Sequence, residues 1–197
     1  MKKGLLFKAR YRRAYAFLLS EFEREPIGSG DIVFLGDSLT HMGSWAAWFP
    51  DRTVRNRGIS GDTSAAVLKR VGHICHDPAA VFLMIGTNDV VTNVPMAQTV
   101  DTVEAIVKAI QAQCPNAVLY VQGVLPNTAE RSPVLELLNE RYRAVAEAAG
   151  ATFVNWWDAF ADSNSAIRPE FCDEVLHLSP AGYVQWVSLL APLVAAA

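Results

Sequence analysis

Runs with the composition of short strands alternate with longer helical segments along most of this 197-residue chain. The strand-like runs lie at residues 32–35, 53–56, 80–85, 117–121 and 152–155. Longer segments with helical periodicity separate them, most clearly residues 96–113 and 133–149. The run at 80–85 is apolar throughout, as expected of a strand with both faces covered. This alternation predicts a three-layer α/β/α fold, in which helices cover both faces of a parallel sheet.

Length and composition limit the classes of protein that fit this chain. We expect one domain, residues 1–197, with a sizeable core. A net charge of −3 and a pI near 5.8 argue against nucleic-acid binding, which requires a basic surface. The tail after Tyr183 comes closest to a membrane span, but it is amphipathic and contains Pro192. Three widely spaced cysteines and the lack of a signal-peptide core predict a cytoplasmic protein.

The first 26 residues are expected to form a helix packed on the body of the domain. Tyr11, Tyr15, Leu18 and Phe22 recur at helical spacing on one stripe, and basic residues crowd the first half of the segment. The favoured interpretation gives this helix a solvated basic face. A helix that lies on a membrane surface is the alternative.

Ser38 follows the first strand, in the segment Gly-Asp-Ser-Leu at residues 36–39. Ligands of open parallel sheets bind beyond the carboxyl ends of the strands, so this serine is a candidate nucleophile. Gly-Asp-Ser is also common in ordinary turns, and the segment alone does not establish a site.

Other loops at the same predicted edge carry residues that could activate Ser38. A serine hydroxyl needs a base, and the base needs a third group to orient it. His177 is the candidate base, with a carboxylate a few residues before it. The backbone N–H groups of Ser38 and Gly61, with the side-chain amide of Asn88, could form an oxyanion hole.

These segments together resemble the SGNH hydrolases, also called GDSL esterases and lipases. The four sequence blocks of that family occur in order, at residues 36–39, 56–64, 86–89 and 177–183. The lead-in helix and residues 45–50 resemble the branch of platelet-activating-factor acetylhydrolase-like and sialate-O-acetylesterase-like proteins. The resemblance implies a flavodoxin-like, five-stranded parallel sheet of order 2-1-3-4-5. It also implies Ser38 as nucleophile, Ser38, Gly61 and Asn88 as oxyanion hole, and His177 as base, with no cofactor or metal.

One position departs from the family pattern. The family usually has Asp three residues before the histidine, where this chain has Glu174, and Asp173 lies one residue earlier. Glu174 is the favoured third member and Asp173 the alternative. A backbone carbonyl that supports a Ser38–His177 dyad is the remaining possibility.

The expected activity is hydrolysis of short acyl esters, acetyl esters above all, of a small or carbohydrate alcohol. The branch resemblance suggests the acetyl group, and aromatic loops could stack on a sugar, with Trp45 and Trp48 as candidate binding residues beside Trp156 and Trp157. A thioesterase or lysophospholipase for longer acyl chains is the alternative. The sequence does not indicate the oligomeric state.

Rival sites are less well supported. The nucleophile segment lacks the second glycine of an α/β-hydrolase elbow. A flavodoxin-like binding module for nucleotides would need a phosphate-binding glycine loop where Asp37 lies. A metal site from His73, Cys75 and His76 lacks further clustered ligands. A catalytically inactive carbohydrate-binding relative would have little reason to keep Ser38, Asn88 and His177 together.

Overall fold

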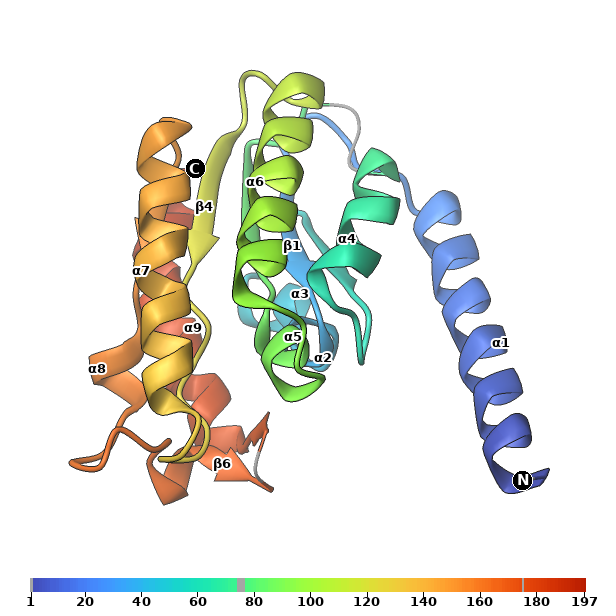
Figure 1. Cartoon of the computed structure of the whole chain (residues 1–197). Coiled ribbons are helices and arrows are strands. Elements are labelled where there is room, and N and C mark those ends of the chain that lie inside the picture. Colours follow the sequence, from blue (N-terminus) through green and yellow to red (C-terminus); the bar gives the residue numbers. More distant parts are fainter. Residues whose placement is uncertain (1, 74–76, 175) are drawn as a thin grey trace.

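The computed structural model describes residues 2–73, 77–174 and 176–197, and its centre is a parallel sheet (Figure 1). The strand order is β2-β1-β3-β4-β5, so the predicted order is confirmed. Pairing in register places Gly36, Gly58 and Met84 level at the carboxyl ends of the three strands on one side of the sheet. The five strands are β1 (Ile32–Gly36), β2 (Val54–Gly58), β3 (Ala80–Met84), β4 (Val118–Gln122) and β5 (Thr152–Val154).

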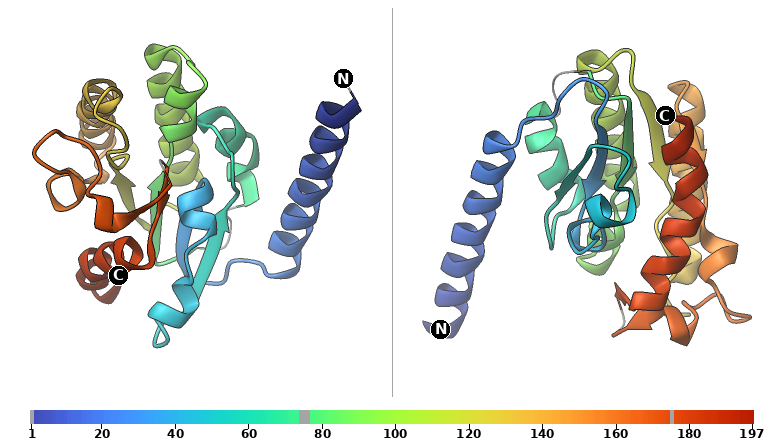
Figure 2. Two further views of the ribbon diagram at one scale, coloured as in Figure 1. Left: turned by 90° about the horizontal axis from the view of Figure 1, so that it is seen from below. Right: turned by 180° about the vertical axis from the view of Figure 1, so that it is seen from behind.

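Helices cover both faces of the sheet, which confirms the three layers (Figures 1 and 2). On one face, α4 (Ser64–Arg70), α6 (Met96–Gln113) and α7 (Ser132–Ala148) pack against alternate strand residues such as Val33 and Val81. On the other face, α3 (Trp45–Trp48) and α9 (Pro180–Ala196) pack against Phe34 and Phe82. Successive strand residues point to opposite faces, so each strand contributes to both cores.

Helix boundaries agree closely with the local sequence signals. The segment 96–113 forms α6 over its predicted length, and α7 begins one residue before the predicted start. Gly150 has φ +67° just beyond α7, the left-handed conformation that ends many helices. Ser179 caps α9, because its Oγ accepts a hydrogen bond from the Gly182 N–H at 3.1 Å, and Pro180 is the first helical residue.

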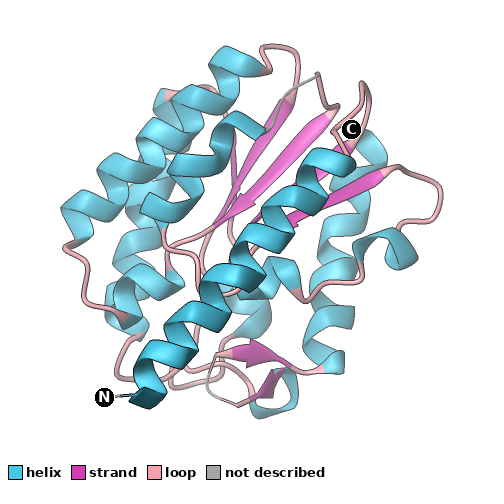
Figure 3. Ribbon diagram, turned by 90° about the vertical axis from the view of Figure 1, so that its right-hand side faces the viewer, coloured by secondary structure: helices cyan, strands magenta, loops and turns pink. Residues whose placement is uncertain are grey.

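The long helix α1 (Lys2–Arg24) lies beside α4 at the edge of the molecule (Figure 1), and in the view of Figure 3 it crosses in front of the sheet. The Phe22 ring lies 4.7 Å from the guanidinium carbon of Arg57, and the Tyr11 hydroxyl reaches the loop after β2. The Phe17 side chain of the same helix is 59% exposed. The assignment of residues 1–197 to a single domain stays a prediction.

Short elements gather at the carboxyl edge of the sheet. They are α2 (Ser38–His41), α5 (Thr87–Val91), α8 (Trp157–Phe160) and the antiparallel pair β6 (Cys172–Asp173) and β7 (His177–Leu178). Two single turns of 3₁₀ helix, η1 (Val71–His73) and η2 (Pro169–Phe171), complete the elements. None of the helices in the described ranges is long and apolar enough to cross a membrane. The cytoplasmic location stays a prediction.

Candidate active site

Ser38 is the first residue of α2, immediately after the turn that ends β1. A Cβ on Gly36 would lie 2.3 Å from both the Met84 carbonyl oxygen and the Thr40 Oγ1, so only glycine fits this turn. Asp37 caps α2, with its Oδ1 accepting the Leu39 N–H at 3.1 Å. The Ser38 side chain is partly exposed at the helix start, where a nucleophile can meet a substrate.

The carboxyl group of Asp37 is 3% exposed directly beside the nucleophile. Burial raises its pKa to about 7, and the carboxylates of Asp62 and Asp89 act in the same direction. The hydrogen bond from the Leu39 N–H opposes this shift. A carboxyl group that titrates near neutral pH therefore lies next to Ser38.

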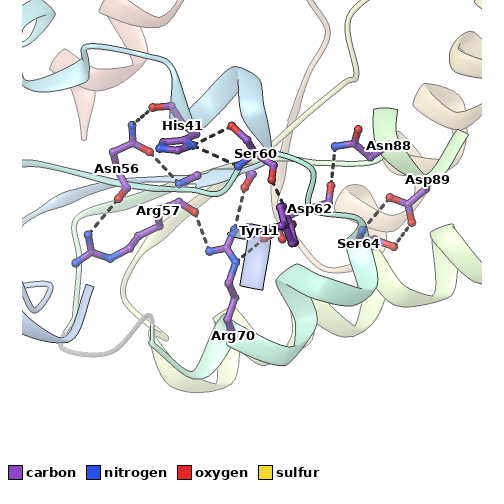
Figure 4. A network of polar contacts seen from close by, with 12 residues as sticks. Tyr11, His41, Asn56, Arg57, Ser60, Asp62, Ser64, Arg70, Asn88 and Asp89 are labelled. Atoms are coloured by element: carbon purple, nitrogen blue, oxygen red, sulfur yellow. Dashed lines mark hydrogen bonds and ion pairs between the residues drawn. The ribbon is translucent and has the colours of Figure 1, made fainter. Parts of the chain in front are cut away.

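The loop after β2 carries Gly61 in a left-handed conformation, φ +85°. The next residue, Asp62, forms a buried ion pair with Arg70 of α4, with 2.7 Å between Oδ2 and Nε. The same guanidinium donates to the Arg57 carbonyl at 2.8 Å and to the Gly36 carbonyl at 2.9 Å (Figure 4). Arg70 thus ties the ends of β1 and β2 to the Gly61 loop. Burial raises the pKa of Asp62, and the Arg70 guanidinium opposes that effect.

Helix α5 brings Asn88 to the same loop. Its Nδ2 donates to the Asp62 carbonyl at 2.8 Å, and that bond uses one of the two amide hydrogens. Asp89 accepts from both the N–H and the Oγ of Ser64, at 2.8 and 2.6 Å (Figure 4). The second and third sequence blocks are therefore joined by buried hydrogen bonds.

The start of α4 corrects one sequence expectation. Asp62 and Thr63 precede this helix and are of the residue types that cap helices, but the side chain of Thr63, the flanking residue, makes no capping hydrogen bond. Asp89 supplies the cap from another element, because its carboxylate accepts the N–H of Ser64. A cap that comes from elsewhere in the chain has no local sequence signal.

His41 and Asn56 are polar residues of this region to which the sequence analysis gave no role. The Nδ1 of His41 lies 2.9 Å from the Ser60 Oγ and accepts the Ser60 N–H at 3.3 Å. The Asn56 amide donates to the carbonyls of Thr40, His41 and Gly43 at the end of α2. The sequence signal that could have pointed to His41 was its position, one turn after Ser38 on the same short helix.

His177 lies on β7, which contacts α2. Tyr183 of the following helix α9 also contacts α2, since its hydroxyl donates to the Leu39 carbonyl at 2.8 Å. Among the interactions of the described residues there is no hydrogen bond between Ser38 and His177. The structure therefore brings together the elements that carry Ser38, Gly61 and Asn88 through hydrogen bonds, and adds the His177 strand by packing.

Both candidate carboxylates lie beside His177. The Glu174 Oε2 is 3.8 Å from the His177 Nδ1, longer than a hydrogen bond, and the Glu174 side chain is 85% exposed. Glu174 has φ +71° in the turn between the two strands. Asp173 is the register partner of His177 across the β6–β7 pair and is exposed. The distance favours Glu174 over Asp173.

The candidate aromatic residues have different environments. Trp45 is 1% exposed, stacks on Phe34 at 4.1 Å and donates to the Thr40 carbonyl. The proposed role of Trp45 in substrate binding is therefore wrong, because the ring is part of the core. Trp157 is also buried, whereas Trp48 and Trp156 are partly exposed.

No cluster of three metal-ligating side chains occurs in the part of the chain that the structure describes. The rejected metal site involved Cys75 and His76, which lie outside the described residues, and the side chain of His73 is likewise not described.

Comparison with known proteins identifies the family. Residues 34–185 match the GDSL-like lipase/acylhydrolase family model. Platelet-activating factor acetylhydrolase IB subunit alpha1 of Bos taurus is 30% identical over 180 residues, which cover 86% of this chain and 75% of the relative. The region matched by the family model contains all of the predicted site residues, Ser38, Gly61, Asn88, Asp173, Glu174 and His177.

Solved structures agree with this result. A structure from Streptococcus pneumonia, provisionally assigned as a platelet activating factor, has a TM-score of 0.88 at 22% identity over 96% of each chain. A GDSL-like lipase from Bacteroides thetaiotaomicron has a TM-score of 0.73 at 25% identity, covering 94% of this chain and 97% of that one. The chain therefore belongs to the GDSL-like lipase/acylhydrolase family, the SGNH hydrolases, in its acetylhydrolase-like branch, and is a carboxylic-ester hydrolase.

Proposed function

We propose that this hydrolase cleaves short acyl esters, acetyl esters above all, through an acyl-enzyme on Ser38. The observation that carries the proposal is the 2.8 Å hydrogen bond from the Asn88 amide to the Asp62 carbonyl. It fixes the side chain of Asn88 next to the Gly61 loop, which the Arg70 guanidinium in turn ties to the end of β1, before Ser38. These connections support the proposal that the donors of Ser38, Gly61 and Asn88, from separate elements, act on one position as an oxyanion hole.

In the proposed reaction the Ser38 Oγ attacks the ester carbonyl carbon, and its proton passes to the Nε2 of His177. The carbonyl oxygen becomes an oxyanion that accepts hydrogen bonds from the N–H groups of Ser38 and Gly61 and from the Asn88 amide. Collapse of this intermediate releases the alcohol, which takes the proton from His177. Water then attacks the acyl-enzyme with the same base, releasing the acid and restoring Ser38.

Glu174 is the proposed third member, which orients His177 through its Nδ1. Its Oε2 lies 3.8 Å from that nitrogen, and the side chain would complete the hydrogen bond by a small rotation. Asp173 is the alternative, since it lies across the β6–β7 pair from His177.

Two observations bear on the acyl group. The 30% identical relative is an acetylhydrolase by name, which supports acetyl esters. A hollow of about 340 Å³ is lined in part by Val90 of α5, the helix that carries Asn88, and it would favour longer acyl chains if the acyl group extends into it. Apolar side chains of Val90, Val94, Met96, Val134 and Leu138 contribute to its lining. A carbohydrate alcohol is supported only by the partly exposed rings of Trp48 and Trp156.

A series of p-nitrophenyl esters from acetate to decanoate tests the acyl preference. We expect kcat/KM to fall as the chain lengthens, and a steady rise would replace the acetyl proposal with the longer-chain one. Ser38→Ala should lower kcat by at least about 10³-fold. A fluorophosphonate should add its mass at Ser38 in the wild-type enzyme and nowhere in Ser38→Ala, and full activity of that variant would refute the nucleophile.

A further inference from the structure

We propose that Tyr11 and His41 are positioning residues that hold Ser60 from two sides and so keep the Ser60–Gly61 peptide group in the orientation needed for oxyanion binding. The inference rests on the proposed function, because it concerns the Gly61 N–H as an oxyanion donor. That N–H and the Ser60 carbonyl belong to one planar peptide group. A group that fixes the carbonyl oxygen of Ser60 therefore also fixes the direction of the Gly61 N–H.

Tyr11 holds this peptide group from the α1 side. Its hydroxyl donates to the Ser60 carbonyl oxygen at 3.3 Å. The same hydroxyl would lie 3.4 Å from a Cβ on Gly61, so the tyrosine ring lies directly over the turn (Figure 4). A donor on a carbonyl oxygen also polarises the peptide and strengthens its N–H as a donor. Tyr11 thus acts on the direction and on the strength of the proposed oxyanion contact.

His41 holds the preceding peptide group from the α2 side. The Ser60 N–H points at the Nδ1 of His41 at 3.3 Å, so this nitrogen is an acceptor and the hydrogen-bond pattern assigns the ring hydrogen to Nε2. The Ser60 hydroxyl lies 2.9 Å from the same nitrogen. Burial lowers the pKa of His41, which favours the neutral ring that can accept.

The two contacts place Ser60 between two helices with different relations to the nucleophile. Helix α2 begins with Ser38 and ends with His41, so the His41 contact sets the distance between nucleophile and oxyanion loop. Helix α1 has few contacts with the rest of the described chain, and the Tyr11 hydroxyl gives it a direct connection to the site. The contact gives the N-terminal helix a role in catalysis besides packing.

Tyr11→Phe tests the inference, because it removes one oxygen and keeps the ring. We expect kcat for p-nitrophenyl acetate to fall about fivefold with KM within twofold of wild type, since the lost contact acts on the transition state. Ser20→Ala is the matched control, because it also removes one hydroxyl from α1, whose hydrogen bond to the Phe17 carbonyl stays within the helix, and it should change kcat by less than twofold. A kcat of Tyr11→Phe within twofold of wild type would overturn the role of Tyr11, as would an increase in KM alone.

A pair of substitutions tests His41. Asn presents an oxygen near the place of the Nδ1, so His41→Asn should keep the acceptor and retain at least about half of the wild-type kcat. His41→Leu removes the acceptor and should lower kcat about tenfold or more. Urea denaturation of both variants separates this effect from unfolding. Equal kcat values for two variants that are equally folded would refute the role of His41.

The proposed function is tested separately in the same preparations. Titration with a fluorophosphonate counts the reactive Ser38 in each variant, and kcat is expressed per reactive serine. If the wild-type enzyme shows no labelling at Ser38 and no ester hydrolysis, the proposed function fails. If labelling is normal and Tyr11→Phe and His41→Leu both match wild type, only the inference about the Ser60–Gly61 peptide fails.

Discussion

Around Gly61 and Asn88 the polar groups are buried and bonded to one another, whereas around His177 they are exposed and loosely paired. Asp62, Arg70 and Asp89 are each less than 5% exposed, and hydrogen bonds of 2.6–2.9 Å connect them to the backbone, to the Ser64 hydroxyl or to each other. Glu174 is 85% exposed and lies 3.8 Å from the imidazole of His177, which is itself 35% exposed. The proposed oxyanion half and the proposed base half thus differ in how they are held.

This difference has a physical reason in the two tasks. Donors for an oxyanion stabilise the transition state because they are already oriented when charge develops, and burial strengthens their effect. A base must accept a proton and release it again in each cycle. Exposure to solvent and some freedom of movement therefore lower the rate less for a base than for an oxyanion donor. The contrast predicts that substitutions in the oxyanion half change stability and activity strongly, and that substitutions of the carboxylates beside His177 change them weakly.

Arg70→Met is the substitution in the oxyanion half that is expected to have the largest effect. It removes the ion pair with Asp62 and both donations to backbone carbonyls, and leaves the Asp62 carboxyl buried without its partner. We expect the free energy of unfolding to fall by roughly 3–5 kcal/mol, measured by urea denaturation at pH 7. Arg55→Met is the matched control, because Arg55 pairs with Asp31 at the same 2.7 Å but is 27% exposed.

The control should lose only about 1 kcal/mol, since a partly exposed ion pair is screened by water. If Arg70→Met loses no more than Arg55→Met, the buried network does not stabilise the oxyanion half. The comparison between the two halves would then lose its energetic basis.

Asp37→Asn tests whether burial gives the nucleophile turn a pH-dependent stability. The pKa of the Asp37 carboxyl is about 7 in the folded protein and near 3.8 when unfolded. Folding therefore takes up a proton between these values, and the stability contributed by neutral Asp37 is lost as the pH rises from about 4 through 7. Asn keeps the acceptor for the Leu39 N–H and cannot ionise.

The variant should match the wild type at pH 4 and be more stable at pH 8, by an amount on the order of 2 kcal/mol and at most about 4 kcal/mol. Urea denaturation at the two pH values measures the difference. Asp173→Asn is the control from the base half and should show no such gain in stability at pH 8. A stability difference between Asp37→Asn and wild type that is the same at both pH values would contradict the prediction.

The features that the sequence predicted well are those encoded over short distances. The three layers followed from the alternation of strand-like and helical segments, and α6 and α7 from helical periodicity, whereas the strand order was implied only by the family resemblance. The composition and periodicity that indicate each of these helices and strands lie within the element itself. Local chemistry was sufficient there.

The features that the sequence did not predict depend on contacts between distant segments. The cap of α4 comes from Asp89, 25 residues away from Ser64, and His41 meets Ser60 across 19 residues. Trp45 was a candidate substrate residue because aromatic rings serve both pockets and cores, and only its stacking on Phe34 distinguishes the two. Pairings of this kind are set by the packing of the whole fold.

Glu174→Gln and Asp173→Asn, in the base half of the site, are expected to have the smallest effects. A buried carboxylate behind a catalytic histidine can contribute about 10⁴-fold to kcat. Glu174 is largely in water and lies beyond hydrogen-bond distance, so we expect Glu174→Gln to lower kcat only about tenfold. Asp173→Asn should stay within twofold of wild type. The opposite ranking would make Asp173 the orienting group, and a loss of 10³-fold or more in either variant would show that the base half is held as firmly as the oxyanion half.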